Sequence, residues 1–137
     1  MSNTGSCLCG ALRYSFTGEP SAKGLCHCKD CRKISGSAFS MNAMFPADAV
    51  TLTAGAPKTY TVAGGSGKPI TSFFCGECGS TVWRETPVFA GLRIVKAGTL
   101  DDPEALERVA KPVVEMFAAN RVGWMPVIKE TDQRKGQ

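Results

Sequence analysis

The stretch "FCGECGS" (74–80) decides the fold of this 137-residue chain. Cys75 and Cys78 are separated by two residues on one turn. Gly79 tolerates the backbone dihedrals of a zinc knuckle, whose amide groups point at the sulfurs. A redox dithiol is the other interpretation of Cys-x-x-Cys. A thioredoxin-type motif, however, belongs between a strand and a helix of a β-α-β unit, and that pattern is absent around residues 74–80. We therefore expect a metal ion at this turn.

The remaining cysteines extend the metal hypothesis to two sites. A structural zinc site has four protein ligands, whereas a catalytic site has three and keeps one position open, so seven cysteines divide naturally into four and three. Either Cys7 and Cys9 complete the knuckle, or members of "CHCKDC" (26–31) do so. The spacing leaves both arrangements open, although the first uses every cysteine and keeps together a compact cysteine trio, namely Cys26, Cys28 and Cys31.

His27 is the single histidine of the chain and lies inside the trio. In an extended segment alternate side chains point the same way, so Cys26 and Cys28 can face one metal ion while His27 faces away from it. We therefore expect His27 to form a hydrogen bond behind the site rather than to serve as a ligand.

Composition places the chain among globular proteins of a reducing compartment. No apolar run approaches the roughly 18 residues that span a bilayer, and the N-terminus does not resemble a signal peptide. An odd number of cysteines cannot all pair as disulfides within one chain. We therefore expect a cytoplasmic protein with metal-bound thiolates and no membrane partner.

The charge argues against nucleic acid as a partner. The formal net charge is +4, but seven thiolates on two Zn²⁺ ions would remove three of those positive charges. Nucleic-acid binding usually requires a dense basic face, so we do not expect it.

Short strands dominate the hydrophobic pattern of the chain. Residues 11–16 alternate between apolar and polar side chains, which is typical of a half-buried strand. Further strands are predicted at 39–45, 50–53, 58–62, 70–74, 81–84, 92–97 and 113–117. Short helices are predicted at 29–35 and 101–109, the latter with Pro103 in its first turn. The pattern predicts one mostly β domain over 1–137 that is stabilised by zinc, with a polar tail at 127–137 that is frayed over 129–137. Trp124 can either line a pocket or lock the C-terminal segment onto the body, and we favour the lock.

Five stretches together resemble one enzyme family. They are "GSCLCGALRYSF" (5–16), "CHCKDCRKISGSAF" (26–39), "FFCGECGSTVW" (73–83), "AGTLDDPEAL" (97–106) and "EMFAANRVGWMP" (115–126). They resemble the glutathione-dependent formaldehyde-activating enzymes and their centromere protein V relatives over residues 5–126. The resemblance implies an Mss4-like fold of folded β-sheets, a β-tent. It also implies a structural zinc on Cys7, Cys9, Cys75 and Cys78 and a second, catalytic and more labile zinc on Cys26, Cys28 and Cys31.

The resemblance further implies a carbon–sulfur lyase that adds glutathione to formaldehyde, giving S-(hydroxymethyl)glutathione. A similar thiol or another small electrophile would suit the same site. A free thiol is mostly protonated at neutral pH and only the thiolate is nucleophilic, so an open position on zinc would activate it. Lys29, Arg32 and Lys33 lie within or just after the trio and are the candidates for binding the carboxylates of glutathione.

Two alternatives use the same cysteines differently. A non-catalytic zinc module that binds nucleic acid or protein would hold both metal ions structurally, but the basic residues are few and lack interleaved aromatics. A redox or metal-storage protein would use "CHCKDC" (26–31) as a reactive thiol trio. One tightly held and one labile zinc would favour the enzyme over both.

Overall fold

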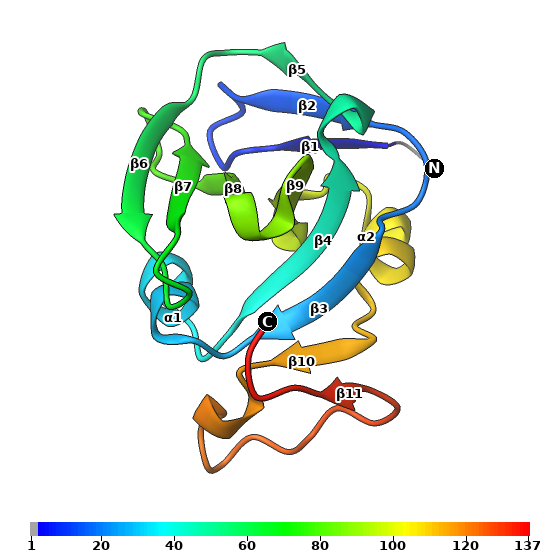
Figure 1. Ribbon diagram of the computed structural model, residues 1–137. Coiled ribbons are helices and arrows are strands. Elements are labelled where there is room, and N and C mark those ends of the chain that lie inside the picture. The colour runs from blue at the N-terminus through cyan, green and yellow to red at the C-terminus, as the bar shows by residue number, and fades with distance from the viewer. Residues whose placement is uncertain (1–2) are drawn as a thin grey trace.

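The computed structural model describes residues 3–137 and confirms a mostly β fold (Figure 1). The strands form two sheets. The smaller has the order β1-β2-β5, with β1 at Thr4–Ser6, β2 at Arg13–Phe16 and β5 at Val50–Ala54. The larger has the order β11-β10-β3-β4-β9-β8-β7-β6. Its members are β3 (Ala22–Cys26), β4 (Ser40–Pro46), β6 (Lys58–Ala63), β7 (Pro69–Phe74), β8 (Thr81–Glu85), β9 (Leu92–Lys96), β10 (Val114–Met116) and β11 (Asp132–Gln133).

Two α-helices accompany the sheets, as the sequence predicts. Helix α1 (Lys29–Ser35) contains Cys31, is capped by Cys28 at its N-terminus and ends at the left-handed Gly36. Helix α2 (Pro103–Ala110) is capped by Asp102, whose side chain accepts from the Glu104 amide. Short 3-10 turns complete the secondary structure at Ala47–Ala49, Pro87–Phe89, Ala97–Thr99 and Ala118–Asn120.

Each strand predicted from alternation is present, and three further strands are not predicted by the sequence pattern. Strand β3 escapes prediction because its last three residues are all buried, so its sequence does not alternate. It lies in the interior of the large sheet, antiparallel to β4 and parallel to β10. Strands β1 and β11 are too short for a periodic pattern.

The main core lies between the small sheet and one face of the large sheet. Phe16 of β2 meets Phe45 of β4 with ring centroids 5.0 Å apart. Val82 and Trp83 of β8 and Val95 of β9 are buried in the same cluster. Burial of these large apolar side chains stabilises the fold and fixes which face of the large sheet is turned away from this core.

The opposite face of the large sheet carries a second, smaller cluster that includes two cysteines of the trio. Met44 pairs with Ile94 between β4 and β9, and Met116 pairs with Cys26 between β10 and β3. All four side chains are buried there together with Cys31. Because successive strand residues point to opposite faces, Cys26 is placed on the side of the sheet away from the main core.

The C-terminal segment pairs with the large sheet, whereas the sequence analysis expects a frayed end at 129–137. Strand β11 pairs in parallel with β10 and closes one edge of the large sheet (Figure 1). Buried Glu115 binds the amide of Ile128 at 3.1 Å and the side chain of Gln133 at 2.8 Å. The polar residues of this segment are partners for a buried carboxylate, which composition alone cannot show.

Trp124 does not lock this segment onto the body, contrary to the sequence-based expectation. Its side chain is 80% exposed. The segment is fastened through the hydrogen bonds of Glu115 instead.

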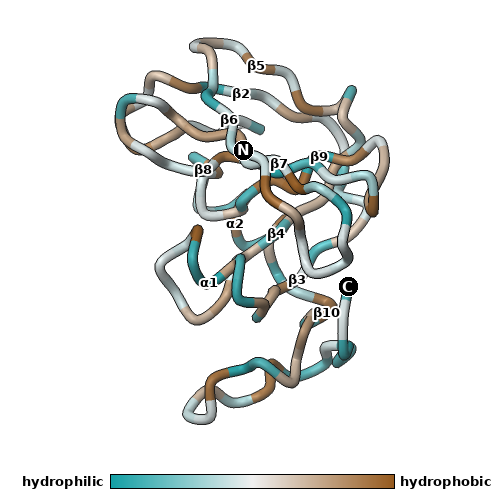
Figure 2. Tube along the Cα trace, turned by 60° about the vertical axis from the view of Figure 1, so that its left-hand side comes forward, coloured by the Kyte–Doolittle hydropathy of each residue, from teal (hydrophilic) through white to brown (hydrophobic). Residues whose placement is uncertain are grey.

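Hydrophobic and hydrophilic residues alternate over short distances along the chain (Figure 2). Among the described residues, no helix combines the length and the apolar character needed to cross a membrane.

Candidate metal centres and the pocket beside one of them

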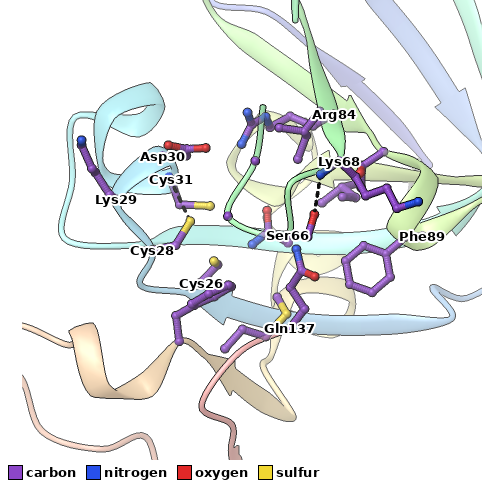
Figure 3. Close-up of a pocket in the computed structure, with 18 of the residues that line it drawn as sticks. Cys26, Cys28, Lys29, Asp30, Cys31, Ser66, Lys68, Arg84, Phe89 and Gln137 are labelled. Carbon is purple, nitrogen blue, oxygen red and sulfur yellow. Dashed lines mark hydrogen bonds between the residues drawn. The ribbon is translucent and has the colours of Figure 1, made fainter. Parts of the chain in front are cut away.

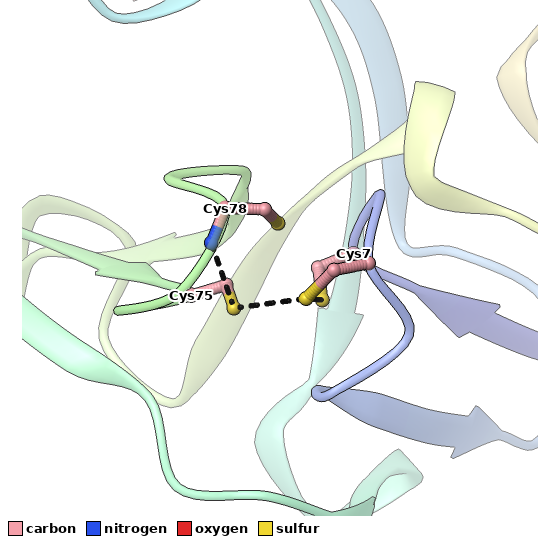
Figure 4. Close-up of side chains that lie close together, drawn as sticks. Cys7, Cys75 and Cys78 are labelled. Carbon is pink, nitrogen blue, oxygen red and sulfur yellow. Dashed lines mark hydrogen bonds between the residues drawn. The ribbon is translucent and has the colours of Figure 1, made fainter.

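Four cysteines from two distant parts of the chain converge on one point. Cys7 and Cys9 lie in the loop between β1 and β2, and Cys75 and Cys78 lie in the turn between β7 and β8; their sulfurs are all within 4.8 Å of one another. Figure 4 shows the sulfurs of Cys7, Cys75 and Cys78 turned toward each other. The Cys7–Cys9 and Cys9–Cys75 sulfur pairs are each 3.7 Å apart. Four sulfurs at ~2.3 Å around a tetrahedral zinc lie ~3.8 Å apart, so this cluster fits zinc.

Both turns that carry these cysteines are built alike. Gly10 and Gly79 each follow a cysteine with φ of +80°, a conformation that side chains with a Cβ rarely adopt. The Leu12 amide donates to the Cys7 sulfur at 3.2 Å, and the Glu77 amide donates to the Cys75 sulfur at 3.4 Å. Such amide bonds stabilise thiolates, which is the knuckle geometry that "FCGECGS" (74–80) predicts.

One cysteine of this cluster, Cys78, lies in surroundings that favour its thiolate form. Hydrogen bonding to Ser80, both through the side chain and through the backbone, lowers the pKa of the Cys78 thiol to about 5. The Cys78 sulfur and the Ser80 hydroxyl oxygen are 3.3 Å apart. The thiolate is also the form of a cysteine that binds a metal ion.

The cysteine trio forms a separate group. The sulfurs of Cys26, Cys28 and Cys31 are within 4.8 Å of one another. Cys26 ends β3, Cys28 is the N-cap of α1, and Cys31 lies in the first turn of that helix. The Cys31 amide donates to the Cys28 sulfur at 3.4 Å. Hydrogen bonds from Cys26 and Cys28 lower the pKa of Cys31, and the charge of Lys96 acts in the same direction.

The side chain of His27 points away from the sulfurs of the trio and toward Glu115, as the alternation argument predicts. Its Nε2 lies 2.8 Å from Oε1 of Glu115, and both side chains are fully buried. Its amide donates to the Met116 carbonyl at 3.1 Å. His27 therefore connects the trio to β10 from behind and contributes no ligand atom to the group.

A pocket of about 380 Å³ opens beside the trio and is lined by all three of its cysteines (Figure 3). Its other walls come from the loop between β6 and β7, from the face of β4, β8 and β9 that is turned away from the main core, and from the segment after β10. The lining combines apolar side chains such as Met44, Phe89 and Ile94 with several charged groups. None of the four cysteines of the first cluster is among the lining residues that the structure describes.

The basic residues predicted to bind a ligand are not gathered in this pocket. Lys29 lines it, whereas Arg32 and Lys33 are exposed on α1 and lie outside the lining. The structure adds three cations that sequence reasoning missed, namely Lys68, Arg84 and Lys96. In the sequence each of them resembles an ordinary polar residue of a strand or loop. Only the register of the sheet reveals that Arg84 and Lys96 share a face with Cys26.

The fold and the two cysteine clusters define a class: a mostly β protein with two sites suited to thiolate-bound metal ions. Residues 2–120 match the model of one family, described as glutathione-dependent formaldehyde-activating enzyme. The match covers most of the chain, so this protein belongs to that family. Zinc is consistent with this membership, and the sulfur geometry above fits it.

A solved structure supports the fold independently. The chain is similar to a protein from Rhodobacter sphaeroides known from a crystal structure, with a TM-score of 0.57 and 20% sequence identity. The similarity covers 75% of this chain and 94% of that one. No protein with curated annotation matches significantly.

Proposed function

We propose that this protein is a zinc-dependent carbon–sulfur lyase that adds glutathione or a similar thiol to formaldehyde or another small electrophile. In this proposal Cys7, Cys9, Cys75 and Cys78 hold a structural zinc, and Cys26, Cys28 and Cys31 hold a catalytic zinc. Membership of the family supports the reaction class. The observation that carries the assignment of roles is that the trio lines a pocket and the four-cysteine cluster does not.

The reaction is an addition that needs no oxidant or reductant. A carbon–sulfur bond forms, the carbonyl π bond breaks, and the thiol proton ends on the former carbonyl oxygen. Zinc bound to the trio would supply a Lewis acid with an open position, which favours the thiolate form of a thiol. The remaining contributions come from the residues of the pocket.

Those residues bind, desolvate and compensate charge. Met44, Phe89 and Ile94 present apolar surface to the cavity, which removes water from around the reacting groups. Three thiolates exceed the charge of one Zn²⁺ ion by one negative charge, which by itself disfavours a fourth thiolate. Half-buried Lys96 faces the same cavity and offsets this charge, with its Nζ held 2.6 Å from Oδ1 of Asn42.

Cobalt spectroscopy tests whether the trio offers an open position to a thiol. Protein with cobalt in the trio should change its visible absorption when glutathione is added, because a fourth sulfur alters the ligand field. S-methylglutathione cannot become a thiolate and should cause no change. In parallel, NMR exchange with ¹³C-formaldehyde should show faster formation of the glutathione adduct with the zinc protein than in buffer.

Equal responses to the two glutathione derivatives, or none to either, would contradict the proposal. The non-catalytic zinc module would then become the better interpretation. Two zinc ions of equally slow release would support that alternative, whereas the proposed enzyme should release the zinc of the trio first.

A further inference from the structure

Arg84 is a buried cation without a counter-ion in the part of the chain that the structure describes. Only 3% of the surface of Arg84 is exposed. Within residues 3–137 its side chain forms no ion pair, and its Nε atom is buried without a hydrogen-bond partner. A guanidinium group removed from water in this way is costly unless something pairs with it. The missing partner is therefore informative.

The register of the large sheet brings this guanidinium to the pocket beside the trio. Arg84 of β8 pairs with Ile94 of β9, and Ile94 pairs with Met44 of β4. Paired residues project to the same face, and so do residues two apart on one strand, which adds Lys96 to that face. The neighbouring Trp83 points the other way and is part of the main core. Figure 3 shows Arg84 with its nitrogens directed toward the side of the pocket where α1 carries Asp30 and Cys31.

Most of the charged side chains that line the pocket are cations. Lys29, Lys68, Arg84 and Lys96 line it together with one acidic residue, Asp30. No ion pair of Asp30 with any of these cations occurs among residues 3–137. Even after three thiolates have bound a Zn²⁺ ion, the pocket keeps an excess of positive charge that a ligand must meet.

We propose that Arg84, assisted by Lys96, forms a carboxylate subsite in this pocket, so that one of the two reactants carries a carboxylate close to its reacting group. This inference rests on the proposed function and narrows its substrate class. A planar guanidinium presents paired donors that match the two oxygens of a carboxylate, and such charge-assisted bonds are strong where water is excluded. Formaldehyde has no anionic group that could pair with Arg84.

The carboxylate can belong to the thiol or to the aldehyde, and matched pairs of probes distinguish the two. For the thiol the pair is 3-mercaptopropanoate and 3-mercaptopropanol. For the aldehyde the pair is glyoxylate and glycolaldehyde. Binding to the zinc-loaded protein is measured by calorimetry. The charged member of one pair should bind about 10- to 100-fold more tightly than the neutral member, and the pair that shows this preference identifies which reactant bears the carboxylate.

Arg84→Gln should abolish that preference, leaving the affinity for the neutral probes unchanged. Arg13→Gln removes an exposed arginine of β2, outside the pocket, and should preserve it. Arg84→Lys keeps the charge but loses the paired donors, so it should retain part of the preference. This variant also serves if Arg84→Gln does not fold, as judged by its near-ultraviolet circular dichroism.

A preference that survives in Arg84→Gln, or none in the wild type with either pair, would overturn the subsite. Failure of the proposed function is recognised separately with 3-(methylthio)propanoate, which has a carboxylate but no thiol. If this compound binds in an Arg84-dependent way while no adduct formation is accelerated, the subsite stands and the lyase proposal falls. If adduct formation is accelerated but no probe binds in an Arg84-dependent way, the lyase proposal stands and the subsite falls.

Discussion

Nε2 of His27 donates a hydrogen bond to Oε1 of Glu115 over 2.8 Å, in a region of the protein that excludes water from both side chains. This His27–Glu115 pair connects the segment between Cys26 and Cys28 to β10. The second oxygen of Glu115 accepts from Arg121 at 3.1 Å and from Gln133 at 2.8 Å. One buried carboxylate thus connects the trio with the segment that follows β10.

The first prediction concerns removal of this carboxylate. Glu115→Ala leaves His27 and Arg121 without their buried partner, and loss of one member of a buried ion pair costs roughly 3–5 kcal/mol. Chemical denaturation should show a decrease in unfolding free energy of that size. Glu107→Ala, an exposed position on α2, is the matched control and should change stability by less than ~0.5 kcal/mol. Equal stability of the two variants would show that Glu115 is not the anchor.

The second prediction concerns acid. Burial raises the pKa of Glu115, but hydrogen bonds from Gln133, His27, the Ile128 amide and Arg121 together lower it to about 2, below the ordinary value of 4.5. Because the folded pKa is depressed, the stabilisation is fully present above pH 4.5 and is lost as the pH falls toward 2.

The difference in unfolding free energy between wild type and Glu115→Gln should therefore be constant at neutral pH and shrink below pH 4.5. Loss of metal in acid affects both proteins and cancels in the difference. A difference that stays constant through acid would mean that Glu115 has an ordinary pKa in the folded protein.

Alternation predicts a strand best where burial alternates along it, as in β2 and β5. Strand β3 is the instructive failure, since Gly24, Leu25 and Cys26 are all buried and leave no periodic pattern. Of the site, the division into Cys7, Cys9, Cys75 and Cys78 against the trio follows from the family resemblance, and the structure brings the same two groups together.

Arg84 and Lys96 of the pocket were beyond sequence reasoning for a physical reason. Lys29 is adjacent to the trio in the chain, whereas Arg84 and Lys96 reach it only through the pairing of β8, β9 and β4. Proximity of that kind depends on strand register, which a single sequence does not specify. The role of the Ile128 amide and the Gln133 side chain as partners of Glu115 was hidden for the same reason.

The third prediction tests the close approach of β3 and β10. A Cβ built on Gly24 would lie 2.5 Å from Cγ1 and 2.6 Å from the carbonyl oxygen of Val114. Gly24→Ala should therefore lower the unfolding free energy by about 1–3 kcal/mol through overpacking. Gly98→Ala is the control, because a Cβ there meets no atom within 4 Å. Thermal melts of the two variants should differ accordingly, and coincident melts would mean that β3 and β10 leave room for a methyl group at position 24.

The fourth prediction concerns the four-cysteine cluster. The sulfurs of Cys75 and Cys9 lie 3.7 Å apart, although the two residues are 66 positions apart in the chain. A metal ion held there therefore connects the loop after β1 to the turn after β7. An unfolded chain lacks this site, and the free energy of metal binding contributes directly to folding. Cys75→Ser should give insoluble or poorly folded protein. A soluble variant with an unchanged melting temperature would show that the cluster is not structural.

The fifth prediction concerns Cys28, and it separates the two clusters. Cys28 is half-buried at the wall of the pocket, and its sulfur accepts a hydrogen bond from the backbone amide of Cys31. Its replacement leaves the main core and the four-cysteine cluster untouched. Cys28→Ser should therefore fold with a circular dichroism spectrum like that of the wild type, lose one metal ion per chain and lose thiol-dependent activity.

Metal analysis after gel filtration measures the loss of metal, and adduct formation with ¹³C-formaldehyde measures the loss of activity. Because two remaining thiolates hold zinc more weakly than three, the loss should be complete after brief exposure to a chelator that spares the other cluster. If Cys28→Ser unfolds as Cys75→Ser does, both clusters are structural, and the pocket beside the trio does not mark an active site.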